Sequence, residues 1–187
     1  NPGTKVSVEY NQFAQVYADI SSGRADFGFI ACPYRRSAGI SMFPVAKDEM
    51  VLIAGNSSPL AGRKSVSVRE LDGMDFISFD RVFPSRRYID AFMRRYNVKH
   101  SVKMELDNIE TIKTAVASGA GVSLLPLSAV RDDENGISLH ALRISDAKFQ
   151  RPIYLLHSRA RKLSAPGLKF MAMFDAGRKN TGEKVKI

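Results

Sequence analysis

Residues 119–126, Gly-Ala-Gly-Val-Ser-Leu-Leu-Pro, constrain most strongly what this chain can fold into. Residues 109–118 have a helical pattern, and a glycine directly after them is a common way to end a helix. The apolar run 122–125 predicts a buried strand, which Pro126 ends. A helix, a tight glycine turn, a strand and a proline in this order are typical of an α/β domain, whose strand ends border a binding cleft.

Strand and helix patterns alternate along the rest of the chain. Residues 5–10 alternate with period two and residues 26–31 are almost continuously apolar, so both predict strands, with an amphipathic helix between them. Residues 40–45 and 49–54 predict two further strands. This alternation indicates βαβ units and therefore an α/β fold class, with mixed, mostly parallel sheets flanked by helices.

The chain is predicted to leave one lobe and return to it. Residues 55–59, Gly-Asn-Ser-Ser-Pro, change the composition abruptly and mark the first crossing. Strands near residue 152 bring the chain back, and a last helix begins after Ser164. We expect a first lobe of residues 1–56 and 151–187, and an inserted second lobe of residues 57–150.

Composition narrows the classes of function. The sequence has no run of about 20 apolar residues that would span a bilayer. Its single cysteine, Cys32, excludes an internal disulfide and fits a reducing compartment, so we expect a cytoplasmic protein without membrane contact. The net charge of +9 suggests nucleic acid, but the basic residues are scattered and form no helix-turn-helix or zinc pattern.

Catalytic and metal chemistry have little support. The histidines His100, His140 and His157 are far apart, and none has a second ligand at metal spacing. Cys32 follows an apolar strand, where it is either a reactive thiol or an inert residue lining a cleft, and the sequence offers no partner histidine. We therefore expect no enzyme activity, no metal and no cofactor.

Ligand binding is favoured at three strand ends. Ligands of open α/β sheets bind beyond the carboxyl ends of the strands, where helix N-termini favour anions. The candidate effector-binding residues are Cys32, Pro33, Tyr34, Arg81, Phe83, Ser85 and Asn108. Ser85 and Asn108 are either helix caps or ligand donors, and both alternatives stay open at this point.

Four segments resemble, in the expected order, the effector-binding domain of LysR-type transcriptional regulators. Residues 2–8 resemble the family's "yPgv.l.l" strand, and residues 22–30 resemble "l..GelDlai". Residues 51–61 resemble "lvlv…HPLa", with Ser58 in place of the usual histidine, and residues 117–126 resemble "aaGlGialLP". Each motif is short, but their order and spacing make the resemblance specific.

The resemblance implies a two-lobed, periplasmic-binding-protein-like (type II) fold that binds a small effector, expected to be anionic, in the interlobe cleft. It implies the inducer-sensing domain of a bacterial regulator that forms a homo-oligomer, a dimer or a tetramer. DNA would be bound only through an N-terminal domain outside this sequence. Family domains also begin with a strand and a helix that this sequence lacks, so we expect an incomplete first lobe. The alternative is a solute-binding protein of the same fold that serves a transporter.

Overall fold

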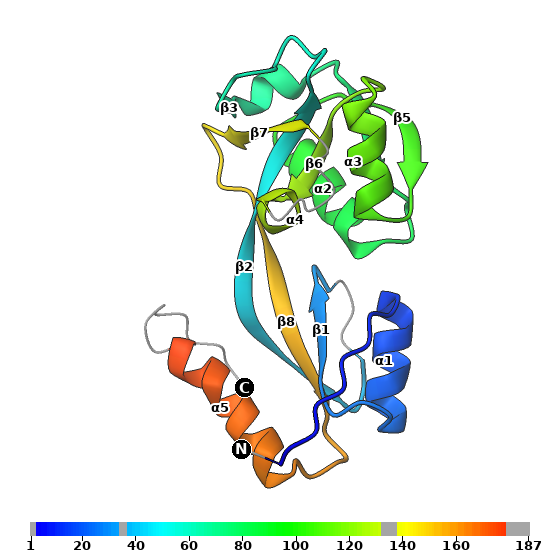
Figure 1. Ribbon diagram of the computed structural model, residues 1–187, viewed down its shortest axis with the longest axis vertical. Helices are drawn as coiled ribbons and strands as arrows, with labels where there is room; N and C mark the ends of the chain where they lie inside the picture. Colours follow the sequence, from blue (N-terminus) through cyan, green and yellow to red (C-terminus); the bar gives the residue numbers. More distant parts are fainter. Residues whose placement is uncertain (1–2, 34–36, 132–137, 179–187) are drawn as a thin grey trace. The chain divides into compact units, whose positions relative to one another are not determined.

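The computed structural model describes residues 3–33, 37–131 and 138–178, and the chain divides into two compact units. Unit 1 comprises Asn1–Ala46 and Pro152–Ile187, and unit 2 comprises Lys47–Arg151. Strand β2 (Ile40–Gly55) passes from unit 1 to unit 2 and strand β8 (Gln150–Ser158) returns (Figure 1). We expected two strands here and a crossing near residue 56, but β2 is continuous, and its second half already belongs to the core of unit 2.

Unit 1 consists of helices packed against a small antiparallel sheet. Helix α1 (Phe13–Ser22) packs on β1 (Gly28–Ala31), and β1 pairs antiparallel with β8. The helix ends at Gly23, whose φ of 76° is the left-handed conformation that glycine adopts most easily. Ile20, Ile30, Ile40 and Leu156 form the buried cluster of this unit. The last helix, α5 (Ala165–Arg178), brings Phe170 against Phe27 and Phe29.

The predicted strand at residues 5–10 is wrong. These residues form no strand, and the side chains of Val6 and Val8 are 75% and 71% exposed. Period-two alternation gives a segment one apolar face, but a strand also needs a neighbour for its backbone hydrogen bonds. Within the described part of the chain, β1 is paired with β8, and residues 5–10 are paired with no strand.

Unit 2 is built on a mixed sheet. In chain order its strands after β2 are β3 (Ser65–Val66), β4 (Asp75–Phe79), β5 (Ser101–Leu106), β6 (Ser123–Pro126) and β7 (Leu139–Ile144). The crossing strand β2 pairs antiparallel with β6 and β7, whereas β3 pairs parallel with β7 and β4 parallel with β5. The expected mixed sheet is confirmed, but the described pairs are not mostly parallel: β1–β8, β2–β6 and β2–β7 are antiparallel, and each of them involves a crossing strand, β2 or β8.

Val122 joins the two parts of this sheet. Its N–H donates to the carbonyl oxygen of Asp75 at 3.0 Å, and its own carbonyl accepts from the N–H of Ile77 at 2.8 Å. The parallel pair β4–β5 is thereby fixed beside β6 and β2. The apolar run predicted at residues 122–125 thus lies in the middle of unit 2, where Leu124 and Leu125 are buried.

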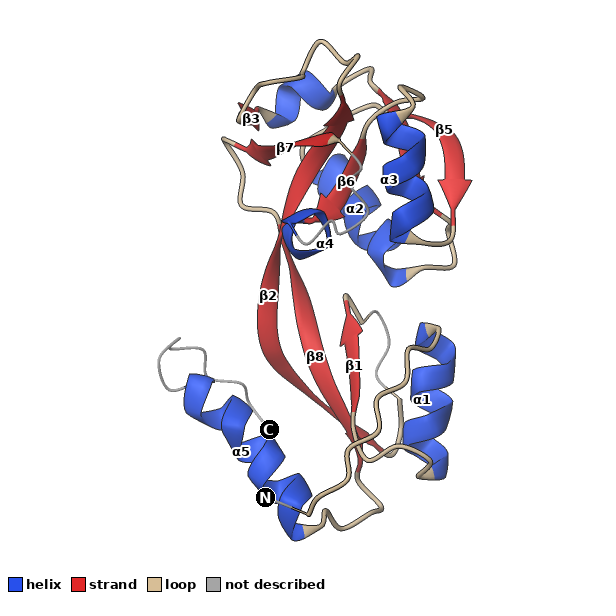
Figure 2. Cartoon of the chain, viewed as in Figure 1, coloured by secondary structure: helices blue, strands red, loops and turns tan. Residues whose placement is uncertain are grey.

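The helices of unit 2 cover this sheet (Figure 2). They are a short 3-10 helix, η1 (Val68–Leu71), followed by α2 (Pro84–Arg95), α3 (Ile109–Ala117) and α4 (Leu127–Arg131). Helix α2 buries Ile89, Phe92 and Met93, and α3 buries Ile112 and Val116, at the helical spacing of an apolar face. Among the described helices, none is long and apolar enough to cross a membrane.

Candidate functional site

Two helices of unit 2 begin at the same edge of the sheet. Strands β4 and β5 are parallel, with Phe79 opposite Leu106, and the N–H of Asp80 donates to the carbonyl oxygen of Leu106 at 2.9 Å. Helix α2 follows β4 and helix α3 follows β5, so both helix N-termini lie beyond the carboxyl ends of neighbouring strands. The first turn of α2 contains no acidic residue. Glu110 lies in the first turn of α3, so this edge presents the partial positive charge of the α2 N-terminus without an acidic residue, and that of the α3 N-terminus beside one.

Ser85 is not the cap of α2. The N-cap position is Phe83, in an extended conformation, and Pro84 occupies the first turn, where its missing N–H costs nothing. The hydroxyl of Ser85 has no hydrogen-bond partner among the described residues, and its side chain is half-buried. Of the two alternatives for Ser85, capping is thus excluded, and its hydroxyl is available as a donor.

Asn108, in contrast, is the cap of α3. Its Oδ1 accepts from the backbone N–H of Thr111 at 2.8 Å and from the Thr111 hydroxyl at 2.8 Å. Its Nδ2 donates to Asp107 at 3.0 Å. The capping alternative explains the side chain fully, although its exposed position leaves the second Nδ2 hydrogen at the same sheet edge.

Arg81 and Phe83 lie in the loop between β4 and α2. The Arg81 side chain is 80% exposed, and its Nε stands 3.2 Å from Oε1 of Glu105. Phe83 is half-buried and packs against Phe79 with ring centroids 6.2 Å apart. Hydrogen bonds from Arg86 and then Arg81 hold the pKa of Glu105 below its ordinary value, so this carboxylate is charged at neutral pH.

Arg86 also lies in this region, although no sequence pattern predicted a role for it. Its side chain is only 6% exposed, and it donates to Asp90 at 2.9 Å, to Glu105 at 3.0 Å and to the carbonyl oxygen of Phe79 at 2.9 Å. Burial opposes its charge, but the hydrogen bonds to Glu105 and Asp90 outweigh burial and raise the pKa of Arg86. The four-residue spacing of Arg86 and Asp90 on one helix was a usable signal for this pair.

The unit 1 candidates lie at the carboxyl end of β1. Cys32 follows that strand with a φ of 50°, and its N–H donates to the carbonyl oxygen of Pro152 at 2.9 Å. The residue is buried, which favours the inert alternative, because reactive thiols are partly exposed. Pro33 is half-buried, and Tyr34 lies outside the described residues. The structure places Arg81, Phe83, Ser85 and Asn108 together at one edge of unit 2, and Cys32 and Pro33 in unit 1.

The histidines give no metal centre. His100 Nε2 stands 3.9 Å from Asp90, and His140 contacts Asn56 and the N–H of Gly62. Across residues 3–33, 37–131 and 138–178, no group of three or more His, Cys, Asp or Glu side chains is arranged to hold a metal ion.

Known proteins similar to this chain are transcriptional regulators. A probable RuBisCO transcriptional regulator of Cyanophora paradoxa is 29% identical over 174 residues, which cover 87% of this chain and 53% of the relative. The uncharacterized HTH-type transcriptional regulator YeiE of Escherichia coli K12 is 28% identical, over 93% of this chain and 59% of the relative. The chain thus spans little more than half the length of these curated relatives.

Solved structures share the fold. The Synechocystis CcmR regulatory domain in complex with 2-PG matches with a TM-score of 0.79 and 24% identity, over 96% of this chain and 86% of that one. The effector-binding domain of QuiR in complex with shikimate matches with a TM-score of 0.75 and 20% identity, over 90% and 79%. HinK, a LysR family regulator of Pseudomonas aeruginosa, matches with a TM-score of 0.81 and 20% identity, over 97% and 61%.

These likenesses confirm the predicted periplasmic-binding-protein-like (type II) fold, with mixed sheets flanked by helices. The sequence itself is matched by the LysR substrate binding domain over residues 1–178, which is nearly its full length. The chain therefore belongs to the family of LysR substrate binding domains.

Proposed function

We propose that this chain is the effector-sensing domain of a LysR-type transcriptional regulator, and that it binds a small anionic effector at the strand ends of unit 2. One observation carries the placement of the site. The register of β4 and β5 brings the N-termini of α2 and α3 to one sheet edge, where the Ser85 hydroxyl has no partner among the described residues. Such an edge suits a carboxylate or a phosphate.

Each proposed residue has a distinct role. Ser85 donates its hydroxyl to the effector, Arg81 adds positive charge, and Phe83 gives an apolar wall. Asn108 fixes the N-terminus of α3 and has one further Nδ2 hydrogen to donate. In unit 1 we propose Cys32, Pro33 and Tyr34 as effector-binding residues at the end of β1.

The relatives support the regulatory role. Those described above are named as transcriptional regulators, which favours a sensor domain over a solute-binding protein of a transporter. The complexes of CcmR with 2-PG and of QuiR with shikimate support a small-molecule effector. We further propose that the whole protein is a cytoplasmic homo-oligomer without enzymatic activity, and that it binds DNA through a domain outside this sequence. An effector that favours one conformation would shift the population of states and so the DNA-binding arrangement.

A thermal-shift screen with calorimetry tests the proposal. We expect one or more small carboxylates or phosphate esters, with 2-PG and shikimate tried first, to raise the melting temperature, because a ligand that binds only the folded state stabilises it. Ser85→Ala should weaken that binding by about 1 kcal/mol, the typical net value of one hydrogen bond, and leave stability almost unchanged.

Asn108→Ala is the matched variant at the same edge. It removes the cap of α3 and should lower the free energy of unfolding by about 1 kcal/mol. Unchanged effector affinity in Ser85→Ala would contradict the proposed site. A screen in which no small anion stabilises the chain would count against the sensing function itself.

A further inference from the structure

One carboxylate oxygen joins two arginines beside the proposed effector site. Oε1 of Glu105, near the end of β5, lies 3.2 Å from Nε of Arg81 and 3.0 Å from Nη1 of Arg86. Arg81 lies in the loop after β4 and Arg86 in the first turn of α2. We propose that Glu105 is a positioning residue: fixed by Arg86, it holds the exposed Arg81 ready to bind an anionic effector. The inference rests on the proposed function, in which Arg81 supplies positive charge to the effector.

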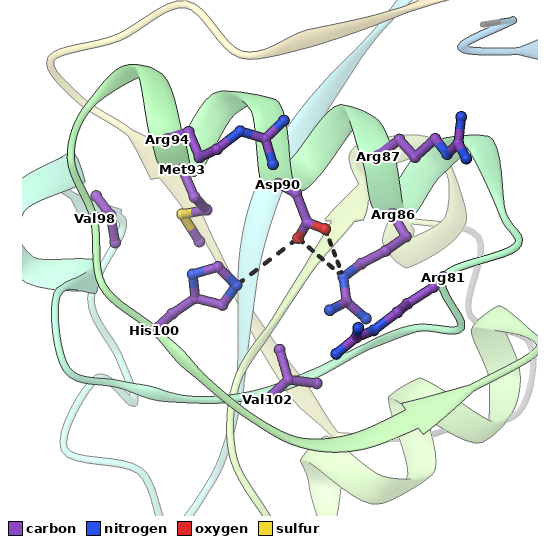
Figure 3. A pocket seen from close by; sticks show the side chains of 9 residues that line it. All are labelled: Arg81, Arg86, Arg87, Asp90, Met93, Arg94, Val98, His100 and Val102. Atoms are coloured by element: carbon purple, nitrogen blue, oxygen red, sulfur yellow. Dashed lines mark hydrogen bonds and ion pairs between the residues drawn. The ribbon is translucent and has the colours of Figure 1, made fainter.

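Arg86 is the rigid end of this arrangement. Its Nη1 donates to the carbonyl oxygen of Phe79 at 2.9 Å as well as to Glu105, and its Nε donates to Asp90 at 2.9 Å. Figure 3 shows the Arg86 guanidinium between Asp90 and Arg81, in a groove of about 630 Å³ along α2. Because one planar guanidinium makes all these bonds, Arg86 cannot turn without losing contacts to β4, β5 and α2 together. Glu105 therefore pairs with a fixed cation.

Arg81 is the mobile end. Its side chain is 80% exposed, and an exposed arginine loses many rotamers when it binds a ligand. Glu105 contacts Nε of Arg81, whereas Nη1 and Nη2 have no hydrogen-bond partner among the described residues. These two groups form an edge of the guanidinium that can bind a carboxylate or a phosphate with two parallel hydrogen bonds. Glu105 thus restrains Arg81 and leaves that edge available to the effector.

Glu105 has two opposing effects on an anion at this site. Its negative charge repels the anion, whereas its contact with Arg81 lowers the cost of ordering that side chain. Repulsion between exposed charges is screened over about 8 Å at physiological salt, and the charge of Glu105 is compensated by two arginines. The cost of ordering a long side chain is not screened. We therefore expect positioning to outweigh repulsion, so that removal of Glu105 weakens anion binding.

Titration calorimetry with 2-PG and with inorganic phosphate, at constant ionic strength, tests this sign. Glu105→Ala should weaken binding about three- to tenfold, the loss expected when one long side chain must be ordered. Glu105→Gln has the same charge as Glu105→Ala but keeps an oxygen that accepts from Arg81, so it should recover part of the affinity. A purely electrostatic role predicts equal affinities for these two variants.

Asp107→Asn is the matched control for the lost charge. Its carboxylate lies at the same sheet edge and contacts Asn108 rather than an arginine. The substitution removes one negative charge and should strengthen anion binding by no more than about twofold. All affinities are compared at a temperature at which urea unfolding shows each variant to be folded, which separates binding from stability.

Nitrogen-15 relaxation of Arg81 Nε measures the restraint without an effector. We expect this N–H to be ordered on the nanosecond timescale in the parent chain and mobile in Glu105→Ala. Loss of order together with weaker anion binding supports the positioning role. Equal or tighter binding in Glu105→Ala, or an Arg81 N–H that stays equally ordered, would overturn it. A parent chain that binds neither anion contradicts the proposed effector site instead, and the relaxation measurement then decides alone whether Glu105 positions Arg81.

Discussion

Oδ2 of Asp48 lies 3.1 Å from Nη2 of Arg151 and joins the two crossing strands, β2 and β8, where they enter unit 2. The two side chains are 11% and 16% exposed. The same carboxylate accepts from the hydroxyl of Ser128 at 2.6 Å, at the start of α4. Asp48 thus connects both crossing strands to α4. Because the Asp48 carboxylate is mostly buried, its negative charge strengthens each of these hydrogen bonds.

Asp48→Asn should lower the free energy of unfolding by about 2–4 kcal/mol, because it leaves Arg151 without its partner in a mostly buried position. Glu49→Gln is the control, since Glu49 pairs with an exposed Arg143 and such surface pairs contribute about 0–1 kcal/mol. Urea unfolding followed by circular dichroism measures both. Similar losses of unfolding free energy in the two variants would show that burial of the Asp48–Arg151 pair does not increase its contribution to stability.

Gly121, in the 119–126 segment, lies against the backbone of β4. A Cβ at this position would stand 2.6 Å from the carbonyl oxygen of Asp75, which accepts from the N–H of Val122. We expect Gly121→Ala to push β4 away from β6 and to cost at least about 2 kcal/mol of stability.

Gly73→Ala is the control for Gly121. It has a positive φ of 73° but no heavy atom within 4 Å of its Cβ position, so it should cost only the roughly 1 kcal/mol of left-handed strain. Thermal unfolding measures the stability of both variants. An equal loss of stability would mean that the backbone at Asp75 moves aside for the new Cβ without an energetic penalty.

Glu70 makes stability depend on acid pH. The backbone N–H of Ser67 and then the side chain of Arg63 lower the pKa of Glu70 from 4.5 to about 2. Because the folded-state pKa lies below the unfolded one, this stabilisation is complete above about pH 4.5 and is lost as pH falls from there toward about pH 2.

Glu70→Gln should therefore flatten the dependence of unfolding free energy on pH between about pH 5 and pH 3. Urea titrations at several pH values measure this slope. Glu9→Gln, at an exposed residue, is the control for the loss of one negative charge. A slope equally steep in Glu70→Gln and the parent chain would contradict the assigned cause.

Sequence patterns correctly predicted those helices, turns and strands that are determined by residues close together in the chain. The helix, glycine turn and strand expected around residues 109–126 are present, with Gly119 at a φ of 86° after α3 and β6 ending at Pro126. Ser67 and Glu70 form a capping box at η1, the arrangement that a Ser-x-x-Glu sequence favours. Each of these features needs only neighbouring residues to form, so the sequence alone carries the necessary information.

Features that depend on distant partners were not predictable. Residues 5–10 have the alternation of a strand without a paired neighbour, and the sequence does not show which strands pair. Arg86 is buried because Glu105, 19 residues away, and the carbonyl of Phe79 come to it only in the fold. Ser85 was expected as a possible cap, but Pro84 fixes the start of α2 one residue earlier, with Phe83 at the N-cap.

The last prediction concerns DNA. The chain has a net charge of +9, but α2 and α3 each bury one face against the sheet of unit 2, and the basic residues are scattered along the sequence. Sequence is read by side chains that reach base edges, whereas scattered positive charge contacts phosphates. We therefore expect this chain to bind DNA only non-specifically, with an affinity that falls steeply as salt is added.

A titration against two unrelated duplexes at near-physiological salt measures this. The two affinities should agree within about threefold, and Arg95→Gln and Arg94→Gln should weaken both duplexes alike, because phosphate contacts carry no sequence information. A preference of about a hundredfold for one duplex corresponds to roughly 2.7 kcal/mol of discrimination. That result would mean that the basic residues of this domain form a reading surface, and the proposal that DNA is bound only through another domain would then be wrong.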